Sequence, residues 1–182
     1  MKNAYVFLAD GFEDVEAITP IDYLRRAGVT VTVVGVSARK AVSARGVTIE
    51  CDRTLREVVS EPLPDLVVLP GGGRGSEGLA ASAELKGLVS RMLAENRLVG
   101  AICAAPAVAL GGWGLLAGRK YTCFPGRGED LPVKPLKSRV VTDGNLITAR
   151  APGVSEEFSI ELVRVLCGAE AAARLASDIL SR

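Results

Sequence analysis

The sequence predicts an α/β domain, in which apolar strands alternate with amphipathic helices around a mainly parallel sheet. Two patterns support this fold class. Short apolar runs occupy residues 4–9, 29–36, 66–69 and 98–102, and helical apolar spacing separates several of them. Parallel strands need crossover connections, which are normally helical and right-handed. We therefore expect helices on both faces of the sheet and a ligand site at the carboxyl ends of its strands.

In the first half of the chain, a strand over residues 4–9 is followed by a helix. Apolar side chains recur at helical spacing at Val15, Ile18, Tyr23 and Leu24. Gly28 ends this pattern, as glycine often does after a helix. The valine-rich run 29–36 predicts the second strand, and the short run 46–50 predicts an edge strand.

The second half adds strands over residues 66–69 and 98–102, with a helix over 84–95 between them. Later strands are marked by Tyr121, Val140-Val141 and Leu146-Ile147, the last two joined as a hairpin by Asp143-Gly144-Asn145. A closing helix is capped by Ser155 and ends before Gly168. Its apolar face carries Phe158, Leu162, Val165 and Leu166.

Length and composition predict a single domain over residues 1–182. The chain has 22 basic and 21 acidic residues and 4% aromatic residues, which argues against a nucleic-acid surface. Its cysteines are Cys51, Cys103, Cys123 and Cys167. They include no Cys-x-x-Cys pair and histidine is absent, so we expect no metal site and no cofactor. No signal-peptide pattern is present, which favours a cytoplasmic location.

One uncharged stretch, residues 98–118, has the length of a membrane span. Pro106 and five glycines interrupt it, and the surrounding pattern explains it as a buried strand and a packed helix. We therefore expect no membrane partner.

Cys103 is the main candidate for a nucleophile. It lies between the apolar run 98–102 and the small residues that begin a helix. A turn of this kind raises the sulfur at the carboxyl edge of the sheet, where free amides and the helix dipole favour a thiolate. Without histidine, no Cys-His dyad or Ser-His-Asp triad can form from this chain. A carboxylate is the expected partner.

Three loops are expected to meet around Cys103: residues 10–16, residues 70–75 and the turn at Cys103 itself. Gly71 and Gly72 let backbone amides approach a ligand, so Gly72 and Ala104 form an expected oxyanion hole. Glu16 is expected to exchange a proton, because burial near a thiolate favours its protonated form. The alternatives are an inert core thiol, acids that merely complement a helix dipole, and an ordinary glycine turn.

The glycine loop has a second interpretation. Gly73-Arg-Gly75-Ser-Glu-Gly78 matches the dinucleotide-binding pattern Gly-x-Gly-x-x-Gly. That pattern belongs after the first strand, with an acidic residue about 20 positions later that binds the ribose. Here the next strand ends in Cys103 instead, and the loop after the first strand is acidic, which would repel a pyrophosphate.

Taken in order, the motifs of this chain resemble those of the ThiJ/PfpI superfamily. They are Ala9 to Glu16 with Pro20, Arg25-Arg26-Ala27-Gly28, Arg45-Gly46, Leu69-Pro70-Gly71-Gly72, Ala101 to Pro106, and Thr148 to Gly153. They are most similar to the branch of the parkinsonism-associated protein deglycase and its bacterial counterparts. The resemblance implies a flavodoxin-like, class I glutamine amidotransferase-like sheet with a nucleophile-elbow cysteine, and a homodimer.

The resemblance also implies roles for individual residues. Cys103 becomes the nucleophile or an oxidation sensor, with Glu16 as its hydrogen-bonded partner and Gly72 and Ala104 as amide donors. Arg25 or Arg26, with Arg45, holds an anion near the site or the dimer interface. One departure is Phe124, which occupies a position where several relatives carry histidine and cannot transfer a proton. Cys123, beside it, is either a second redox thiol or a buried strand cysteine.

We therefore expect a glutathione-independent enzyme that acts on methylglyoxal-like 2-oxoaldehydes and on early glycation adducts, with Cys103 as nucleophile and Glu16 as proton shuttle. The alternative is a non-catalytic sensor or chaperone that responds through oxidation of Cys103. A cysteine peptidase or amidase is disfavoured, because no group is evident that could protonate an amine leaving group.

Overall fold

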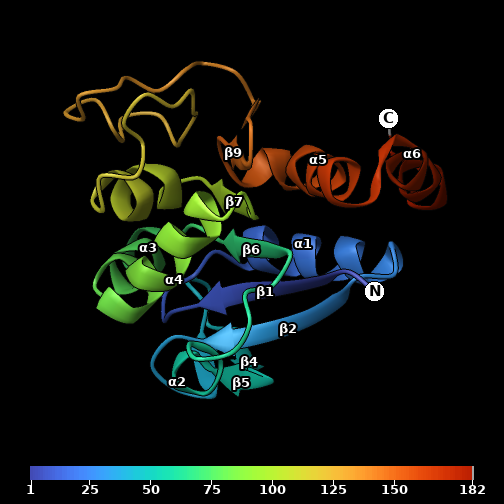
Figure 1. Cartoon of the computed structure of the whole chain (residues 1–182), viewed down its shortest axis with the longest axis horizontal. Helices are drawn as coiled ribbons and strands as arrows, with labels where there is room; N and C mark the ends of the chain where they lie inside the picture. Colours follow the sequence, from blue (N-terminus) through green and yellow to red (C-terminus); the bar gives the residue numbers. More distant parts are fainter. Residues whose placement is uncertain (182) are drawn as a thin grey trace.

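The computed structural model describes residues 1–181 and is built around one seven-stranded sheet (Figure 1). In chain order, its strands are β1 (Asn3–Leu8), β2 (Thr30–Gly35), β5 (Arg53–Thr54), β6 (Leu66–Leu69), β7 (Leu98–Ile102), β8 (Val140–Asp143) and β9 (Leu146–Ala149). The order across the sheet is β5-β2-β1-β6-β7-β9-β8. All neighbouring strands are parallel except β8 and β9. The predicted mainly parallel sheet is confirmed.

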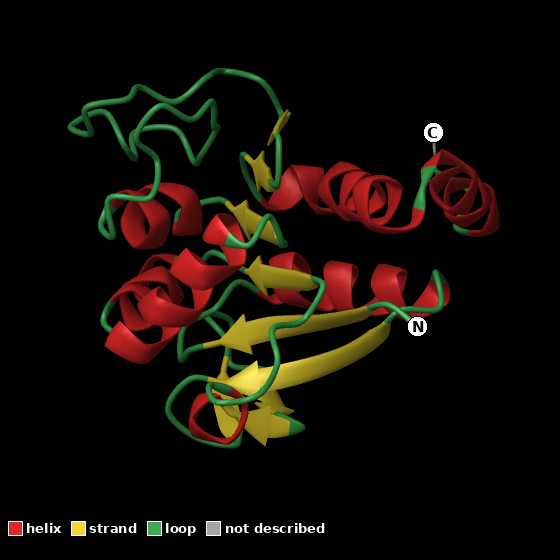
Figure 2. Cartoon of the chain, in the orientation of Figure 1, coloured by secondary structure: helices red, strands yellow, loops and turns green. Residues whose placement is uncertain are grey.

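Helices cover both faces of this sheet (Figure 2). One face is covered by α1 (Asp14–Arg26) and α5 (Ser155–Cys167), with α6 (Ala169–Asp178) packed on α5. The other core includes α2 (Leu55–Val58), α3 (Gly73–Ala80), α4 (Ala83–Ala94) and the π-helical turn η1 (Pro106–Gly111). Strand β1 divides its side chains between the two cores, with Val6 and Leu8 in the first and Tyr5 and Phe7 in the second. This two-residue period is what a strand buried on both faces requires.

Two predicted strands differ from the structure. Residues 46–50 do not form the edge of the main sheet, because β4 (Thr48–Glu50) pairs with β3 (Lys40–Val42) in a separate two-stranded sheet and β5 takes the edge. Tyr121 is fully buried but lies in no strand, and only an isolated bridge joins Thr122 to Leu136. An apolar residue there signals burial of a loop in the core, not strand pairing.

The helices also differ from expectation at several points. Ser155 is the first residue of α5 and not its cap, because the 3-10 turn η2 (Pro152–Val154) runs directly into the helix. The Ser155 hydroxyl donates to the carbonyl of Pro152 at 2.8 Å. Gly168 ends α5 as predicted, with a φ of +97°. Neither α3 nor α6 was predicted, and three glycines in α3 hide its helical pattern.

The uncharged stretch 98–118 holds β7, the turn at Cys103 and η1, and not one long helix. Within residues 1–181, no helix combines the length and the apolar character needed to cross a membrane.

The close seating of α5 on β7 can be tested at Gly100. A Cβ at this position would come within 2.8 Å of Leu162 Cδ2 and 3.0 Å of Phe158 Cζ. We expect Gly100→Val to lower the free energy of unfolding by about 1–3 kcal/mol, the usual cost of overpacking a core. Urea unfolding measures this change. Gly87→Ala is the matched control, since its added methyl meets open space on α4, and it should stabilise the protein by about 0.4–1 kcal/mol. A Gly100→Val protein as stable as the wild type would contradict this packing.

Candidate active site

The three predicted loops do meet at the carboxyl edge of the sheet, and they pack backbone against backbone. The amide of Gly75 donates to the carbonyl of Gly11 at 3.2 Å, and the amide of Glu13 donates to the carbonyl of Gly71 at 3.1 Å. A Cβ on Gly72 would lie 2.2 Å from the Gly11 carbonyl oxygen, and the φ of Gly72 is +88°. Only glycine allows this approach, so the glycine loop positions the first loop as well as supplying amides.

Cys103 follows β7 in a conformation that few non-glycine residues adopt. Its φ is +64°, in the left-handed region. Its amide donates to the carbonyl of Ala149 in β9 at 2.9 Å, and its carbonyl accepts from the amide of Phe124 at 2.7 Å. The backbone amides of Gly72 and Ala104 hydrogen-bond to its sulfur. These contacts hold the sulfur at the sheet edge between two donors, with the residue 8% exposed.

Glu16 belongs to the first turn of α1 and is fully buried beside Cys103. Its Oε2 accepts a hydrogen bond from the Gly71 amide at 2.9 Å. Burial raises the pKa of this carboxyl from 4.5 to about 7, although hydrogen bonds from the Cys103 thiol and the Gly71 amide lower it. The structure therefore places next to the thiol a carboxyl that gains or loses its proton near neutral pH.

The thiol itself does not match the expectation of a favoured thiolate. Burial raises the pKa of Cys103 to about 12, and the charge of Glu16 and the hydrogen bond to it add to the rise. The Gly72 and Ala104 amides lower this pKa but do not outweigh the loss of solvent. One of the three raising causes, the charge of Glu16, exists only while Glu16 is ionised. Protonation of Glu16 therefore lowers the thiol pKa, and the two groups titrate as a pair.

Gly71 lies against both members of this pair. A Cβ there would lie 2.5 Å from Glu16 Oε2 and 2.6 Å from Cys103 Cβ. Its amide is bound to Glu16, so it is not one of the donors that face the sulfur. The sequence predicts that Gly71 contributes to substrate binding, and in the structure its amide orients the Glu16 carboxylate. No spacing in the sequence distinguishes these two tasks.

The predicted arginines lie away from Cys103. Arg45 is at the rim of the site, with its guanidinium 4.0 Å from the Glu13 carboxylate and its side chain 75% exposed. Arg26 lies at the far end of α1 from Glu16, about 15 Å along the helix axis. It donates to Asp22 at 2.9 Å. Within one chain Arg26 therefore does not reach Cys103, because the two ends of a crossover helix lie at opposite edges of the sheet. The dimer interface is the other place where it is expected to hold an anion.

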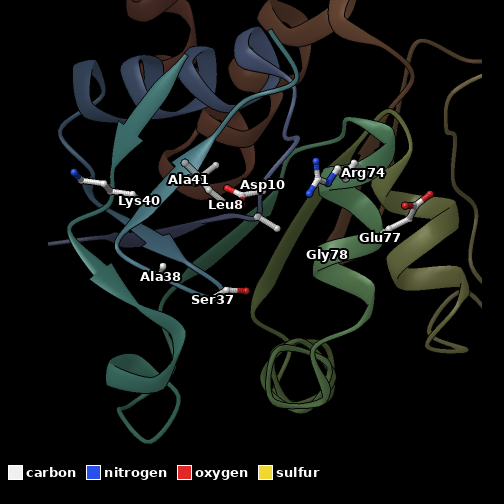
Figure 3. Close-up of a pocket in the computed structure, with 10 residues that line it drawn as sticks. Leu8, Asp10, Ser37, Ala38, Lys40, Ala41, Arg74, Glu77 and Gly78 are labelled. Carbon is white, nitrogen blue, oxygen red and sulfur yellow. The ribbon is translucent and has the colours of Figure 1, made fainter. Parts of the chain in front are cut away.

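A cavity of about 270 Å³ lies beside the first loop, between the ends of β1 and β2 and helix α3 (Figure 3). Asp10, Ser37 and Arg74 are among its lining residues, and neither Cys103 nor Glu16 lines it. Sequence reasoning did not identify this cavity, although its position beside the switch point between β1 and β6 follows from the strand order. In the part of the chain that is described, no group of three His, Cys, Asp or Glu side chains could hold a metal ion.

Comparisons with known proteins agree with this geometry. A model of the DJ-1/PfpI family matches residues 2–165. Protein DJ-1 homologs B and A of Arabidopsis thaliana are each 40% identical over 100% of this chain, which spans 42% and 47% of their length. The chain thus spans about half the length of these two relatives. A protein of Pyrococcus abyssi named a deglycase is 32% identical over 88% of the chain and 97% of its own length.

Solved structures show the same fold. A structure described as oxidized DJ-1 of Toxoplasma gondii aligns with a TM-score of 0.95 at 33% identity, covering 99% of this chain and 98% of that one.

The raised pKa of Glu16 makes stability depend on pH. In the unfolded chain the carboxyl titrates near 4.5, and in the folded protein near 7. The raised pKa of Glu16 therefore makes its full contribution to the free energy of unfolding below pH 4.5, and this stabilising contribution is lost as the pH rises through 7. Glu16→Gln removes this pH-dependent loss of stability, because glutamine does not titrate. We expect the stability of the variant relative to wild type to increase by up to about 3 kcal/mol between pH 4.5 and about pH 8.

Urea unfolding of both proteins at several pH values measures this difference. Glu84→Gln, at an exposed carboxyl in the first turn of α4, is the matched control for the loss of one carboxyl from the start of a helix. If the stability difference for Glu16→Gln varies with pH no more than that for Glu84→Gln, the carboxyl of Glu16 has no raised pKa.

Proposed function

Because the chain belongs to the DJ-1/PfpI family, we propose that it is a cysteine-dependent enzyme of the glyoxalase III and deglycase type. Its substrates are small 2-oxoaldehydes such as methylglyoxal and early glycation adducts, and it needs neither glutathione nor a cofactor. The observation that carries this proposal is the buried pair of Cys103 and Glu16, in which a nucleophile contacts a carboxyl with a pKa of about 7. The similarity to the Pyrococcus abyssi protein named a deglycase supports the same class of reaction.

In the first step, Cys103 adds to the aldehyde carbon. The sulfur–carbon bond forms while the Glu16 carboxylate accepts the thiol proton, and the carbonyl electrons move to oxygen. A concerted transfer suits this site, because the thiol pKa of about 12 keeps a free thiolate scarce. Glu16 then returns the proton to the new oxygen, which gives a hemithioacetal.

In the second step, Glu16 moves a proton between the two substrate carbons. It removes the proton from the carbon bonded to sulfur, and the electrons form an enediol with the neighbouring carbonyl. As the proton returns to the second carbon, the hydroxyl on the carbon bonded to sulfur becomes the thioester carbonyl and its proton passes to the neighbouring oxygen, which gives the thioester of a 2-hydroxy acid. Water then adds to the thioester, the sulfur–carbon bond breaks and the thiol is restored. The reaction consumes water and needs no oxidant or reductant.

The oxyanions of these steps require donors near the sulfur. The amides of Gly72 and Ala104 hydrogen-bond to Cys103 Sγ, so an oxygen on the attacked carbon would form beside them. Backbone donors held in place before the reaction stabilise such charge without reorganisation. Arg45 at the rim is available for an anionic part of a glycation adduct.

A homodimer and a cytoplasmic location form part of the same proposal. Val15 and Ile18 on α1 and Val47 beside β4 are about half exposed, which supports an apolar surface for a second copy. All four cysteines are free, as is usual in a reducing compartment.

The second candidate function is a sensor of oxidative stress, or a chaperone controlled by oxidation. The observation that favours it is the set of partners around the thiol: a carboxyl and two amides could also hold an oxidised sulfur. Turnover separates the two functions.

We expect purified protein to convert methylglyoxal to lactate without glutathione. Cys103→Ala removes the nucleophile, and Glu16→Gln keeps the shape but cannot accept a proton, so each should lower turnover by at least about 100-fold. Cys167→Ala, a matched change at a free cysteine on α5, should leave the rate unchanged. Full activity of Glu16→Gln would remove Glu16 from the mechanism. An inactive wild type whose Cys103 is still the first cysteine oxidised by limiting peroxide would favour the sensor.

Phe124 tests how far the missing histidine limits the rate. Its amide donates to the Cys103 carbonyl, so its side chain begins next to the nucleophile. If a histidine here relays protons, Phe124→His should raise kcat by up to about 100-fold and add an imidazole step to the pH profile. Phe124→Gln is the control, since it is polar and does not titrate. Equal rates for the two variants would show that Glu16 alone carries the proton transfers.

A further inference from the structure

The long connection between η1 and β8 forms a second, basic pocket beside the candidate active site. Residues 112–139 contain no helix or strand, only the isolated bridge between Thr122 and Leu136. In Figure 1 this segment is the large loop that stands above η1. Irregular segments of this length in a compact domain commonly serve a function.

The base of the segment is fastened to β9 by the amide of Thr122, which donates to the Thr148 hydroxyl at 3.0 Å, and further hydrogen bonds hold the segment together. The buried Tyr121 donates its hydroxyl proton to the carbonyl of Val133 at 2.8 Å, and the Thr122 hydroxyl donates to the carbonyl of Leu136 at 2.8 Å. The amide of Leu136 donates to the carbonyl of Tyr121 at 2.7 Å. The buried thiol of Cys123 donates to the carbonyl of Arg127 at 3.0 Å. The pocket enclosed by this loop is therefore a built feature of the fold.

The pocket has a volume of about 390 Å³, and its charged lining is unbalanced. Four of its lining residues are cations, Arg127, Lys134, Lys137 and Arg150, and Glu129 is the one acid. Two of these cations bond to backbone carbonyls, Lys134 to that of Glu129 and Arg150 to that of Lys137. These bonds hold the cations around the pocket without neutralising them.

No protein carboxylate forms an ion pair with any of these four cations in the described part of the chain. Twelve ion pairs join side chains within residues 1–181, with a limit of 4.0 Å, and none includes Arg127, Lys134, Lys137 or Arg150. A concave surface lined by one sign of charge concentrates the opposite charge. An exposed ion pair is worth little by itself, so several cations must act together to hold a ligand.

Apolar side chains complete the lining. Phe124 is 42% exposed and Leu136 is 44% exposed, and both line the pocket. A flat apolar group that covers them would leave water while its charged group meets the cations. Together these observations define the ligand as an anion with an apolar body.

We propose that this pocket is a binding site for a small organic anion, whose charged group contacts Lys134, Lys137 and the two arginines and whose apolar face covers Phe124 and Leu136. The site is distinct from Cys103 and does not depend on the proposed function. It is next to the nucleophile all the same, because the Phe124 amide bonds to the Cys103 carbonyl and Arg150 follows Ala149, which accepts the Cys103 amide.

Calorimetric titration with benzoate, phenyl phosphate and acetate tests this proposal. The two aromatic anions should bind, and acetate, which has the charge but no ring, should bind more weakly. Stronger binding of phenyl phosphate than of benzoate would identify a phosphate ligand, and the reverse a carboxylate. Both outcomes support the site. Absence of binding by both aromatic anions overturns it.

Variants assign the binding to this pocket. Lys134→Gln with Lys137→Gln should weaken benzoate binding about tenfold. The matched control, Lys86→Gln with Lys120→Gln, removes the same charge from exposed lysines that line no part of the pocket and should leave binding unchanged. Leu136→Ser should reduce the advantage of benzoate over acetate. If the two double variants bind equally, the affinity comes from net charge and the proposal is wrong.

One further variant separates this site from the nucleophile. Cys103→Ala should bind benzoate with wild-type affinity, whether or not the wild type turns over methylglyoxal. Loss of benzoate binding in Cys103→Ala would place the anion at the nucleophile and overturn a separate pocket.

Discussion

The burial of the Glu16 carboxyl is the constraint on which the site depends. Burying a charged carboxylate away from water is costly. Burial therefore favours the protonated form of Glu16, and a hydrogen bond from the Gly71 amide stabilises the ionised form. That bond requires the glycine loop to pass between Glu16 and Cys103, where no side chain fits. The close contact of the loops, the start of α1 beside β1 and the left-handed turn at Cys103 all serve the same arrangement.

The charge states of Glu16 and Cys103 are coupled. Desolvation opposes charge on both groups, and a charged Glu16 opposes charge on the sulfur, whereas the hydrogen bond from the thiol favours charge on Glu16. The amides of Gly72 and Ala104 favour negative charge on the sulfur. The charge of Glu16 opposes it, and this repulsion disappears only when Glu16 is protonated. In the proposed mechanism the thiol is protonated at rest, and the nucleophile forms together with the proton transfer. This differs from a cysteine activated by a histidine, where the ion pair exists before substrate binds.

Sequence reasoning succeeded where a residue type allows few interpretations. Apolar runs located the strands of the parallel sheet, and the position of Cys103 after β7 followed from its small neighbours. Sequence reasoning failed where a property depends on contacts between residues far apart in the chain. The strength of desolvation at Cys103 depends on what covers the sulfur, and no local pattern reports that. Arg26 shows the other limit, because a motif gives the order of residues but not the edge of the sheet at which each one lies.

The carboxyl edge of this sheet combines a rigid part with an adaptable part. Glu16, Gly71 and Cys103 are fixed by contacts that admit almost no other residue. The loop that supplies Phe124 is held at its base by hydrogen bonds such as that from the Thr122 hydroxyl to the Leu136 carbonyl, while its cations and apolar side chains line a pocket. Substitutions in that loop leave the pair intact, because none of its side chains supports the Glu16 hydrogen bond. If both proposals hold, the chemistry at Cys103 and the selection of ligands by the loop can change independently on one scaffold.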